Sequence, residues 1–345
     1  MCDRGPTVKV RHLENKLGIH GSPTCELVFT NTPCRLIGER QRGLITYVMA
    51  LMNGARLGIA AQSLGVAEAA QRLARDYANS REQFGAPIEH LPAVAEMVVD
   101  MRVRIEAARA LCYETARVCD YENNINRLLE RNADALSADE KKSFKQKART
   151  IKKLNAMLTP MSKYYCSETS IGVSTDAIQV LGGSGYMKDY AAERYYRDAR
   201  ITSIYEGTSQ LQVVAAIRGL TSGVYKSYIE EFEAKEYDDE ALDALKAKLI
   251  TAHAKLSDAI AFARDKGAAY VELRARKIVD VGVAILIGHY LLGQAAKNDR
   301  KKKVADYFIV KALSESAASL ASIQNGATHV LDNYLEFVGP VSEAE

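Results

Sequence analysis

One acidic residue stands in a sequence context that suits proton-transfer chemistry. The segment Ile204-Tyr205-Glu206-Gly207-Thr208-Ser209-Gln210 follows an apolar position, Ile201, and leads into a helical pattern. A carboxylate that apolar neighbours partly shelter can act as a general base, because desolvation makes its charged form less stable. The glycine lets backbone N–H groups come close to a ligand. Seen alone, the pattern also fits an ordinary acidic residue in the first turn of a helix, where the helix dipole favours it.

A second cluster, Arg81-Glu82-Gln83-Phe84-Gly85, follows a long helical pattern. An arginine can pair with a phosphate through two parallel hydrogen bonds, and an aromatic ring can cover a flat ligand. The alternative is a helix end that carries an exposed arginine.

A third cluster, Gln179-Val180-Leu181-Gly182-Gly183-Ser184-Gly185-Tyr186, is rich in glycine. It is not a dinucleotide-binding fingerprint, because its spacing differs and it follows a helix rather than a strand. These glycines permit close approach of the backbone to a ligand, or they simply end the helix.

The composition bounds the class of protein. At 345 residues the chain is long enough for two or three domains, and its 48% hydrophobic content supplies a sizeable core. A net charge of +3 is too small to indicate a nucleic acid or a membrane surface as partner. We find no leader and no apolar run of membrane-spanning length, so we expect a cytoplasmic protein. A mitochondrial matrix protein without its transit peptide would look the same.

The six cysteines predict neither a metal site nor a disulfide framework. They stand at positions 2, 25, 34, 112, 119 and 166, without a C-x-x-C pair and without histidines at zinc-finger spacing. We therefore expect reduced structural thiols and no metal.

The opening residues differ from the rest of the chain. Residues 8–10 and 25–29 have the composition of short strands, which cannot form a stable sheet alone. They form either the edge of a sheet supplied by sequence outside this chain, or a strand pair lying on the helices. We favour the first, and so expect the chain to be a fragment.

Helical periodicity begins at Gly43 and continues to the end. It predicts an all-α fold: an antiparallel bundle, an additional helical domain and a short β remnant at the N-terminus. Residues 122–153 are charged and predict either a solvated connector together with the exposed face of a helix, which we favour, or a basic binding strip, with a helix cap at Ser137–Glu140. The predicted helices cover 44–80, 92–121, 155–181, 206–220, 226–236, 239–265, 268–296 and 302–337.

Taken together and in this order, the three clusters resemble the acyl-CoA dehydrogenase family. Arg-x-Gln-Phe-Gly, Gln-Val-Leu-Gly-Gly-Ser-Gly-Tyr and Tyr-Glu-Gly-Thr-Ser-Gln each match its C-terminal helical domain. The resemblance covers about residues 8–220 and implies a remnant of the middle β-domain over 1–42 and the C-terminal four-helix bundle over 43–221. Residues 222–345 are similar to the extra helical domain of larger bacterial members.

The resemblance implies a role for Glu206 as the catalytic base. It would remove the pro-R α-proton of an acyl-CoA thioester while the β-hydrogen leaves as hydride to N5 of FAD, giving a trans-2-enoyl-CoA. The backbone N–H of Glu206 would help to polarise the thioester carbonyl. Some members place the base on an earlier helix, where this chain has Ala55, so Glu206 is the only candidate.

The resemblance also implies ligand contacts at other positions. Thr208 and Gln210 match positions that contact FAD. Arg81 and Gln83, with Phe84 nearby, match positions that hold the pyrophosphate of an FAD bound mainly by the neighbouring subunit. The positions that match contacts to the adenosine end of FAD are Gln179, Gly182 and Gly183. The residues that match positions near the acyl-CoA are Asn53, Arg56, Tyr205 and Gly207.

Nothing here resembles the family's N-terminal helical domain or most of its β-domain, so we expect this fragment alone to be inactive. The resemblance implies electron-transfer flavoprotein as the acceptor and a homo-oligomer, a dimer or a tetramer. We expect the extension over 225–345 to replace half of the usual tetramer contacts and to leave a dimer. Two alternatives stay open: a non-catalytic helical assembly module, and an acyl-CoA oxidase that uses oxygen.

Overall fold

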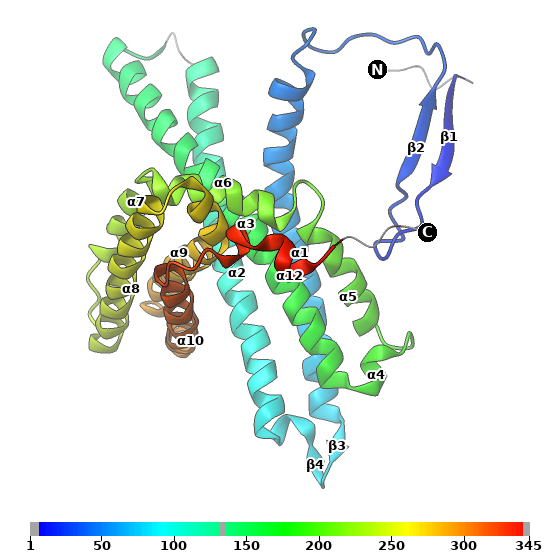
Figure 1. Ribbon diagram of the computed structural model, residues 1–345, viewed down its shortest axis with the longest axis vertical. Helices are drawn as coiled ribbons and strands as arrows, with labels where there is room; N and C mark the ends of the chain where they lie inside the picture. Colours follow the sequence, from blue (N-terminus) through cyan, green and yellow to red (C-terminus); the bar gives the residue numbers. More distant parts are fainter. Residues whose placement is uncertain (1–6, 132–134, 341–345) are drawn as a thin grey trace. The chain divides into compact units, whose positions relative to one another are not determined.

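The computed structural model describes residues 7–131 and 135–340, and gives the backbone alone at positions 45, 46, 49, 50 and 53. Long helices dominate this part of the chain, which confirms the predicted all-α fold (Figure 1). The chain divides into two compact units. The first comprises Met1–Cys112 and Ser162–Ser209, and the second comprises Tyr113–Met161 and Gln210–Glu345.

The first unit is built on three long helices. They are α1 (Met49–Ser80), which follows a π-helical segment over Gly43–Val48, the first half of α2 (Pro92–Arg131) and the second half of α3 (Ala138–Leu181). Four alanines on α1, at 67, 70, 74 and 78, are fully buried in a core shared with Met101 and Ile105 of α2 and with Val173 and Ala177 of α3. Because alanine at three-to-four spacing forms one narrow stripe, it lets neighbouring helices approach closely.

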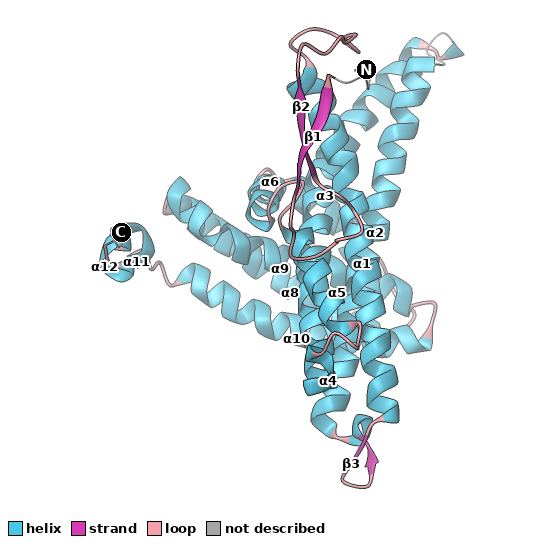
Figure 2. Ribbon diagram, turned by 90° about the vertical axis from the view of Figure 1, so that its right-hand side faces the viewer, coloured by secondary structure: helices cyan, strands magenta, loops and turns pink. Residues whose placement is uncertain are grey.

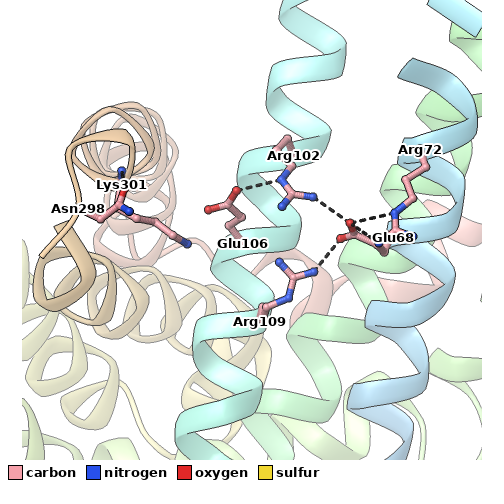
Figure 3. Close-up of polar contacts among 7 residues, drawn as sticks. All are labelled: Glu68, Arg72, Arg102, Glu106, Arg109, Asn298 and Lys301. Atoms are coloured by element: carbon pink, nitrogen blue, oxygen red, sulfur yellow. Dashed lines mark hydrogen bonds and ion pairs between the residues drawn. The ribbon is translucent and has the colours of Figure 1, made fainter. Parts of the chain in front are cut away.

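Charged side chains add to the contact between α1 and α2. Glu68 of α1 accepts hydrogen bonds from Arg102 Nη1 at 2.9 Å and from Arg109 Nη2 at 2.7 Å (Figure 3). Burial raises the pKa of Glu68, but the hydrogen bonds and charges of the two arginines outweigh it and lower this pKa overall. Arg102 also pairs with the buried Glu106 at 2.9 Å. This network fixes how α1 lies along α2.

The long helices end where glycine signals predict. After α1 comes a small hairpin of β3 (Glu82–Gln83) and β4 (Ala86–Pro87), followed by a 3₁₀ turn over Ile88–His90. Helix α3 stops at Leu181, and Gly182 has φ 59°, a conformation that glycine adopts readily. Two short helices that we did not predict follow, α4 (Gly183–Tyr186) and α5 (Ala192–Arg200).

The predicted strands are present at the N-terminal end of the first unit. Strands β1 (Val8–Leu13) and β2 (Cys25–Phe29) pair antiparallel, with Val8 opposite Phe29. The connection between them lies on α5, because Ile19 N donates to Asp198 Oδ1 at 2.6 Å and Arg197 donates to the Leu17 carbonyl at 2.9 Å. A Cβ at Gly18 would stand 2.6 Å from the Arg197 carbonyl oxygen, so only glycine fits there.

The second unit contains the C-terminal helices α7 (Val224–Glu233), α8 (Glu240–Asp265), α9 (Ala268–Ala295) and α10 (Asp299–Gln324), with the short α11 (His329–Asp332) and α12 (Tyr334–Val338). Helices α8, α9 and α10 pack side by side (Figure 2). Caps begin two of them, since the Asp239 side chain accepts from the N–H groups of Ala241 and Leu242, and Asn298 accepts from that of Lys301.

The predicted helix boundaries around residues 122–153 and within 302–337 are wrong. Helix α2 runs beyond the predicted end at 121 to Arg131, and α3 begins at Ala138 rather than at 155. The predicted cap is confirmed there: Ser137 N donates to the Glu140 carboxylate at 2.9 Å, and Glu140 N donates to Ser137 Oγ at 3.3 Å. The single helix expected over 302–337 is interrupted after Gln324, where Gly326 has φ 69°.

Helix α9 corrects the statement that no apolar run reaches membrane-spanning length. An 18-residue window within Ala268–Ala295 has a mean hydropathy of 1.6, enough by composition to cross a bilayer. However, 78% of that window is buried. Its apolar residues are accounted for by packing against α8 and α10.

Helix α9 also carries a buried histidine that lacks hydrogen bonds. His289 is 1% exposed, and neither of its ring nitrogens has a partner among the described residues. Its environment is cationic, since His253, Lys235 and Lys246 all oppose its protonation. Burial, reinforced by these charges, lowers the pKa of His289 to about 4.

This environment predicts that protonation of His289 limits stability in acid. The unfolded chain takes up the proton near pH 6.5 and the folded chain only near pH 4, so the free energy of unfolding should fall by about 3 kcal/mol between pH 7 and pH 4 through this group. Urea unfolding of His289→Leu should show a correspondingly weaker loss, whereas the exposed control His329→Gln should behave as wild type. An unchanged loss in His289→Leu would contradict this assignment.

Candidate functional site

Glu206 lies in a strained turn rather than in a helix. A 3₁₀ turn over Ile201–Ser203 precedes it, and α6 (Ser209–Thr221) begins only after it, which corrects the predicted helix start and rules out the first-turn interpretation. Glu206 has φ 54° and Gly207 has φ 97°. Left-handed backbone of this kind costs a non-glycine residue about 1–3 kcal/mol and persists where surrounding contacts enforce it. The side chain of Glu206 is half-buried.

Side chains from α1 and α3 hold this turn. Arg56 Nε donates to the Glu206 carbonyl at 3.3 Å, and Lys163 Nζ donates to the Gly207 carbonyl at 2.8 Å. The Tyr205 hydroxyl donates to Oε1 of Gln62 on α1. The structure therefore brings four predicted site residues together: Arg56, Tyr205, Glu206 and Gly207.

Helix α3 contacts the same segment at two more points. Ser167 Oγ donates to the Thr202 carbonyl at 2.9 Å, and Ser209 Oγ donates to Glu168 Oε1 at 2.5 Å. Gln62, Lys163 and Glu168 were not among the site residues predicted from the sequence. The only signal available for Lys163 was its place on the buried face of a helix, a position where lysine is rare.

The arginine cluster forms an exposed hairpin. Arg81, Gln83 and Phe84 are all exposed, and Phe84 retains 92% of its accessible surface although it is an aromatic residue. Phe84 has φ 55° and Gly85 has φ 84°, so the tip of the hairpin is tightly turned. An arginine beside an uncovered aromatic ring can bind a phosphate and a flat ring system together.

The glycine cluster lies at the same end of the first unit as this hairpin. Val180 and Leu181 share one core cluster with Ala78 and Ile88, which flank the hairpin in sequence. Gln179, Gly182 and Gly183 are exposed, and a Cβ on either glycine would meet no atom within 4 Å. This open space leaves room for a ligand to approach the backbone.

The two ends of α1 separate these residues into two groups. Arg56 lies near the start of the helix and Arg81 directly after its end, about 36 Å away at about 1.5 Å per residue. Within a single copy of the first unit, Glu206 therefore lies far from the hairpin and glycine clusters. Of the other predicted residues, Thr208 is exposed directly after Gly207, Gln210 belongs to the second unit, and the Asn53 side chain lies outside the described part.

The described part of the chain contains no group of three His, Cys, Asp or Glu side chains that could hold a metal ion. Its cysteines, at 25, 34, 112, 119 and 166, are free thiols. The groups at the Glu206 turn are the carboxylates of Glu206 and Glu168, the cations of Arg56 and Lys163, and backbone carbonyls.

The turn geometry predicts that Gly207→Ala destabilises the protein. A Cβ at φ 97° is strained, so the free energy of unfolding should fall by roughly 1–3 kcal/mol. Gly58→Ala is the matched control, because Gly58 is exposed inside α1 with nothing within 4 Å, and alanine there should stabilise by up to about 1 kcal/mol. Urea unfolding of both variants measures these changes. An equal change in the free energy of unfolding in the two variants would contradict a strained backbone at Gly207→Ala.

Comparison with known proteins agrees with this arrangement of motifs. Residues 42–221 match the family model described as acyl-CoA dehydrogenase, C-terminal domain, and residues 221–329 match that described as acyl-CoA dehydrogenase C terminal. An acyl-CoA dehydrogenase of Bacillus subtilis is 38% identical over 221 residues, covering 63% of this chain and 50% of that protein. The chain spans about half the length of the curated relatives it matches.

Solved structures share the fold. Caenorhabditis elegans ACDH-11 in complex with C11-CoA is 25% identical with a TM-score of 0.73, over 88% of this chain and 50% of that one. An acyl-CoA dehydrogenase of Bacillus anthracis complexed with FAD is 24% identical with a TM-score of 0.71, over 96% of this chain and 59% of that one. The chain belongs to the acyl-CoA dehydrogenase family.

Proposed function

We propose that the protein is an FAD-dependent acyl-CoA dehydrogenase that converts acyl-CoA thioesters into trans-2-enoyl-CoA, with Glu206 as the base. One observation carries the proposal: the family motif Tyr205–Gln210 forms a turn that presents a half-buried carboxylate on rigid helices. The names of the relatives support acyl-CoA as the substrate class, and C11-CoA is bound by ACDH-11.

In this mechanism Glu206 takes the α-proton of the thioester. Arg56 and Lys163 hold the backbone carbonyls of Glu206 and Gly207, so little reorganisation is needed when the carboxylate acts. The N–H of Glu206 would donate to the thioester oxygen, where negative charge develops. Tyr205 is tied to α1 through Gln62 and lines the site beside the base.

The hairpin and glycine clusters fit FAD. Arg81 can pair with its pyrophosphate, Phe84 offers an uncovered ring nearby, and Gly182 and Gly183 leave open space for its adenosine end. When bound, FAD supplies a two-electron acceptor for the hydride that leaves the β-carbon. Thr208 and Gln210 would contact the FAD beside Glu206, and Asn53 would lie near the acyl-CoA.

The separation along α1 supports a homo-oligomer. Because Arg81 lies about 36 Å along the helix from the Glu206 turn, the two groups would serve different FAD molecules. A second copy of the chain would then supply Arg81, Gln83 and Phe84 to the site that contains Glu206. A dimer meets this requirement, and so does a tetramer.

The remaining assignments follow from the family. We propose domains over 1–42, 43–221 and 222–345, a role in fatty acid β-oxidation, and electron-transfer flavoprotein as the acceptor. Free thiols in the described part support a reducing compartment, the cytoplasm. Reoxidation by oxygen would instead indicate an oxidase. A flavin-free, inactive full-length protein would favour the helical assembly module.

Replacing the base should abolish turnover. Anaerobic reduction of the bound FAD by acyl-CoA should slow by about 10²–10⁴ in Glu206→Gln, because a general base contributes a factor of this size. The control Glu96→Gln removes an exposed carboxylate on α2 and should reduce its FAD at the wild-type rate. Undiminished flavin bleaching in Glu206→Gln would refute the assignment.

A further inference from the structure

Lys163 is the residue of the Glu206 site that family motifs leave unassigned. It lies on α3 and is 0% exposed, among the largest fully buried side chains in the described part of the chain. Burying an ammonium group away from water costs several kcal/mol unless it is hydrogen-bonded and its charge is compensated. A buried lysine of this kind points to a specific role for its charge or for its hydrogen bond.

The contacts of Lys163 indicate its role in the Glu206 turn. Its Nζ donates to the Gly207 carbonyl at 2.8 Å, directly after the base in the sequence. The carboxylates of Glu168, on its own helix, and of Glu206, in the turn, both favour its charged form, whereas Arg56 of α1 opposes it. Burial is the largest effect and, with Arg56, lowers the pKa of Lys163 to about 8. Near neutral pH the group is still mainly protonated.

The hydrogen bond from Lys163 to the Gly207 carbonyl helps to hold the backbone of the turn. Glu206 and Gly207 both adopt left-handed backbone, with φ 54° and 97°, and their carbonyls accept hydrogen bonds from Arg56 of α1 and Lys163 of α3 respectively. Ser167 and Glu168, one turn further along α3, anchor Thr202 and Ser209 on either side of the turn. Among these three residues of α3, Lys163 bonds the residue directly after the strained Glu206.

We propose that Lys163 is a positioning residue for the base: by holding the Gly207 carbonyl it keeps the strained turn in the conformation that points the Glu206 carboxylate at the α-carbon of the substrate. The inference rests on the proposed function and extends it to a residue outside the motif. It predicts that loss of Lys163 slows the proton-transfer step more than it weakens binding of the acyl-CoA or of FAD.

The test uses the full-length, FAD-loaded protein. In Lys163→Met, which keeps the length of the side chain and removes the donor, the rate of FAD reduction at saturating acyl-CoA should fall by about 10–100-fold, the size expected from a misplaced catalytic group. The dissociation constant for acyl-CoA, from spectral titration of the oxidised enzyme, should change by less than about threefold. Lys163→Gln restores a neutral donor and should recover part of the rate.

Two controls separate positioning from folding. Lys152→Met removes an exposed lysine from the same helix and should leave the rate unchanged. Combined with Glu206→Gln, Lys163→Met should cause almost no further loss, because both changes act through one group. An additional loss of the same factor in that background would overturn the proposal.

Failure of the inference is distinguishable from failure of the proposed function. If acyl-CoA reduces wild-type FAD and Glu206→Gln blocks it, a rate within twofold of wild type in Lys163→Met overturns the positioning role alone. If Lys163→Met does not fold, Lys163→Leu, which also lacks a donor, carries the test, and a Leu variant with weakened acyl-CoA binding but a normal reduction rate overturns the role. If wild-type FAD is not reduced by any acyl-CoA, the proposed function itself is wrong.

Discussion

The anchoring of one strained turn between two helices is the interaction on which the site depends. Glu206 adopts left-handed backbone, which is strained for a residue other than glycine, and hydrogen bonds from Arg56 and Lys163 to the Glu206 and Gly207 carbonyls hold the turn. A carboxylate on a free loop would sample many directions. On this turn it inherits the rigidity of α1 and α3, which a packed alanine stripe and the Glu68 network join to α2.

The length of α1 imposes the second constraint. The helix has the Glu206 turn near one end and the hairpin of Arg81 and Phe84 beyond the other. Under the proposed function, a single first unit would therefore hold halves of two different sites. Such an enzyme would assemble each site from two copies of the chain, and symmetry would make both sites equivalent.

Much of this could be predicted from the sequence, and the reasons for the failures are physical. Gly182 marks the end of α3 and Gly85 the hairpin turn after α1, because few other residues adopt positive φ. Glu206 was placed in a helix because a turn and a first helical turn share the same residue types. Lys163 was not selected because it stands in a helix full of lysines, and periodicity does not show which of them faces a carbonyl 44 residues later. Such contacts depend on packing between helices.

The most direct test of the account is complementation between two inactive variants, Glu206→Gln and Arg81→Ala, co-produced with different tags so that mixed oligomers can be purified. Each parent should be inactive with acyl-CoA, the first without a base and the second without its FAD contact. The mixed oligomer should regain a substantial part of wild-type activity, about half in a dimer, because one site combines an intact Glu206 with an intact Arg81 of the other copy. A mixed oligomer as inactive as its parents would mean that both residues act within one chain, and would contradict the account.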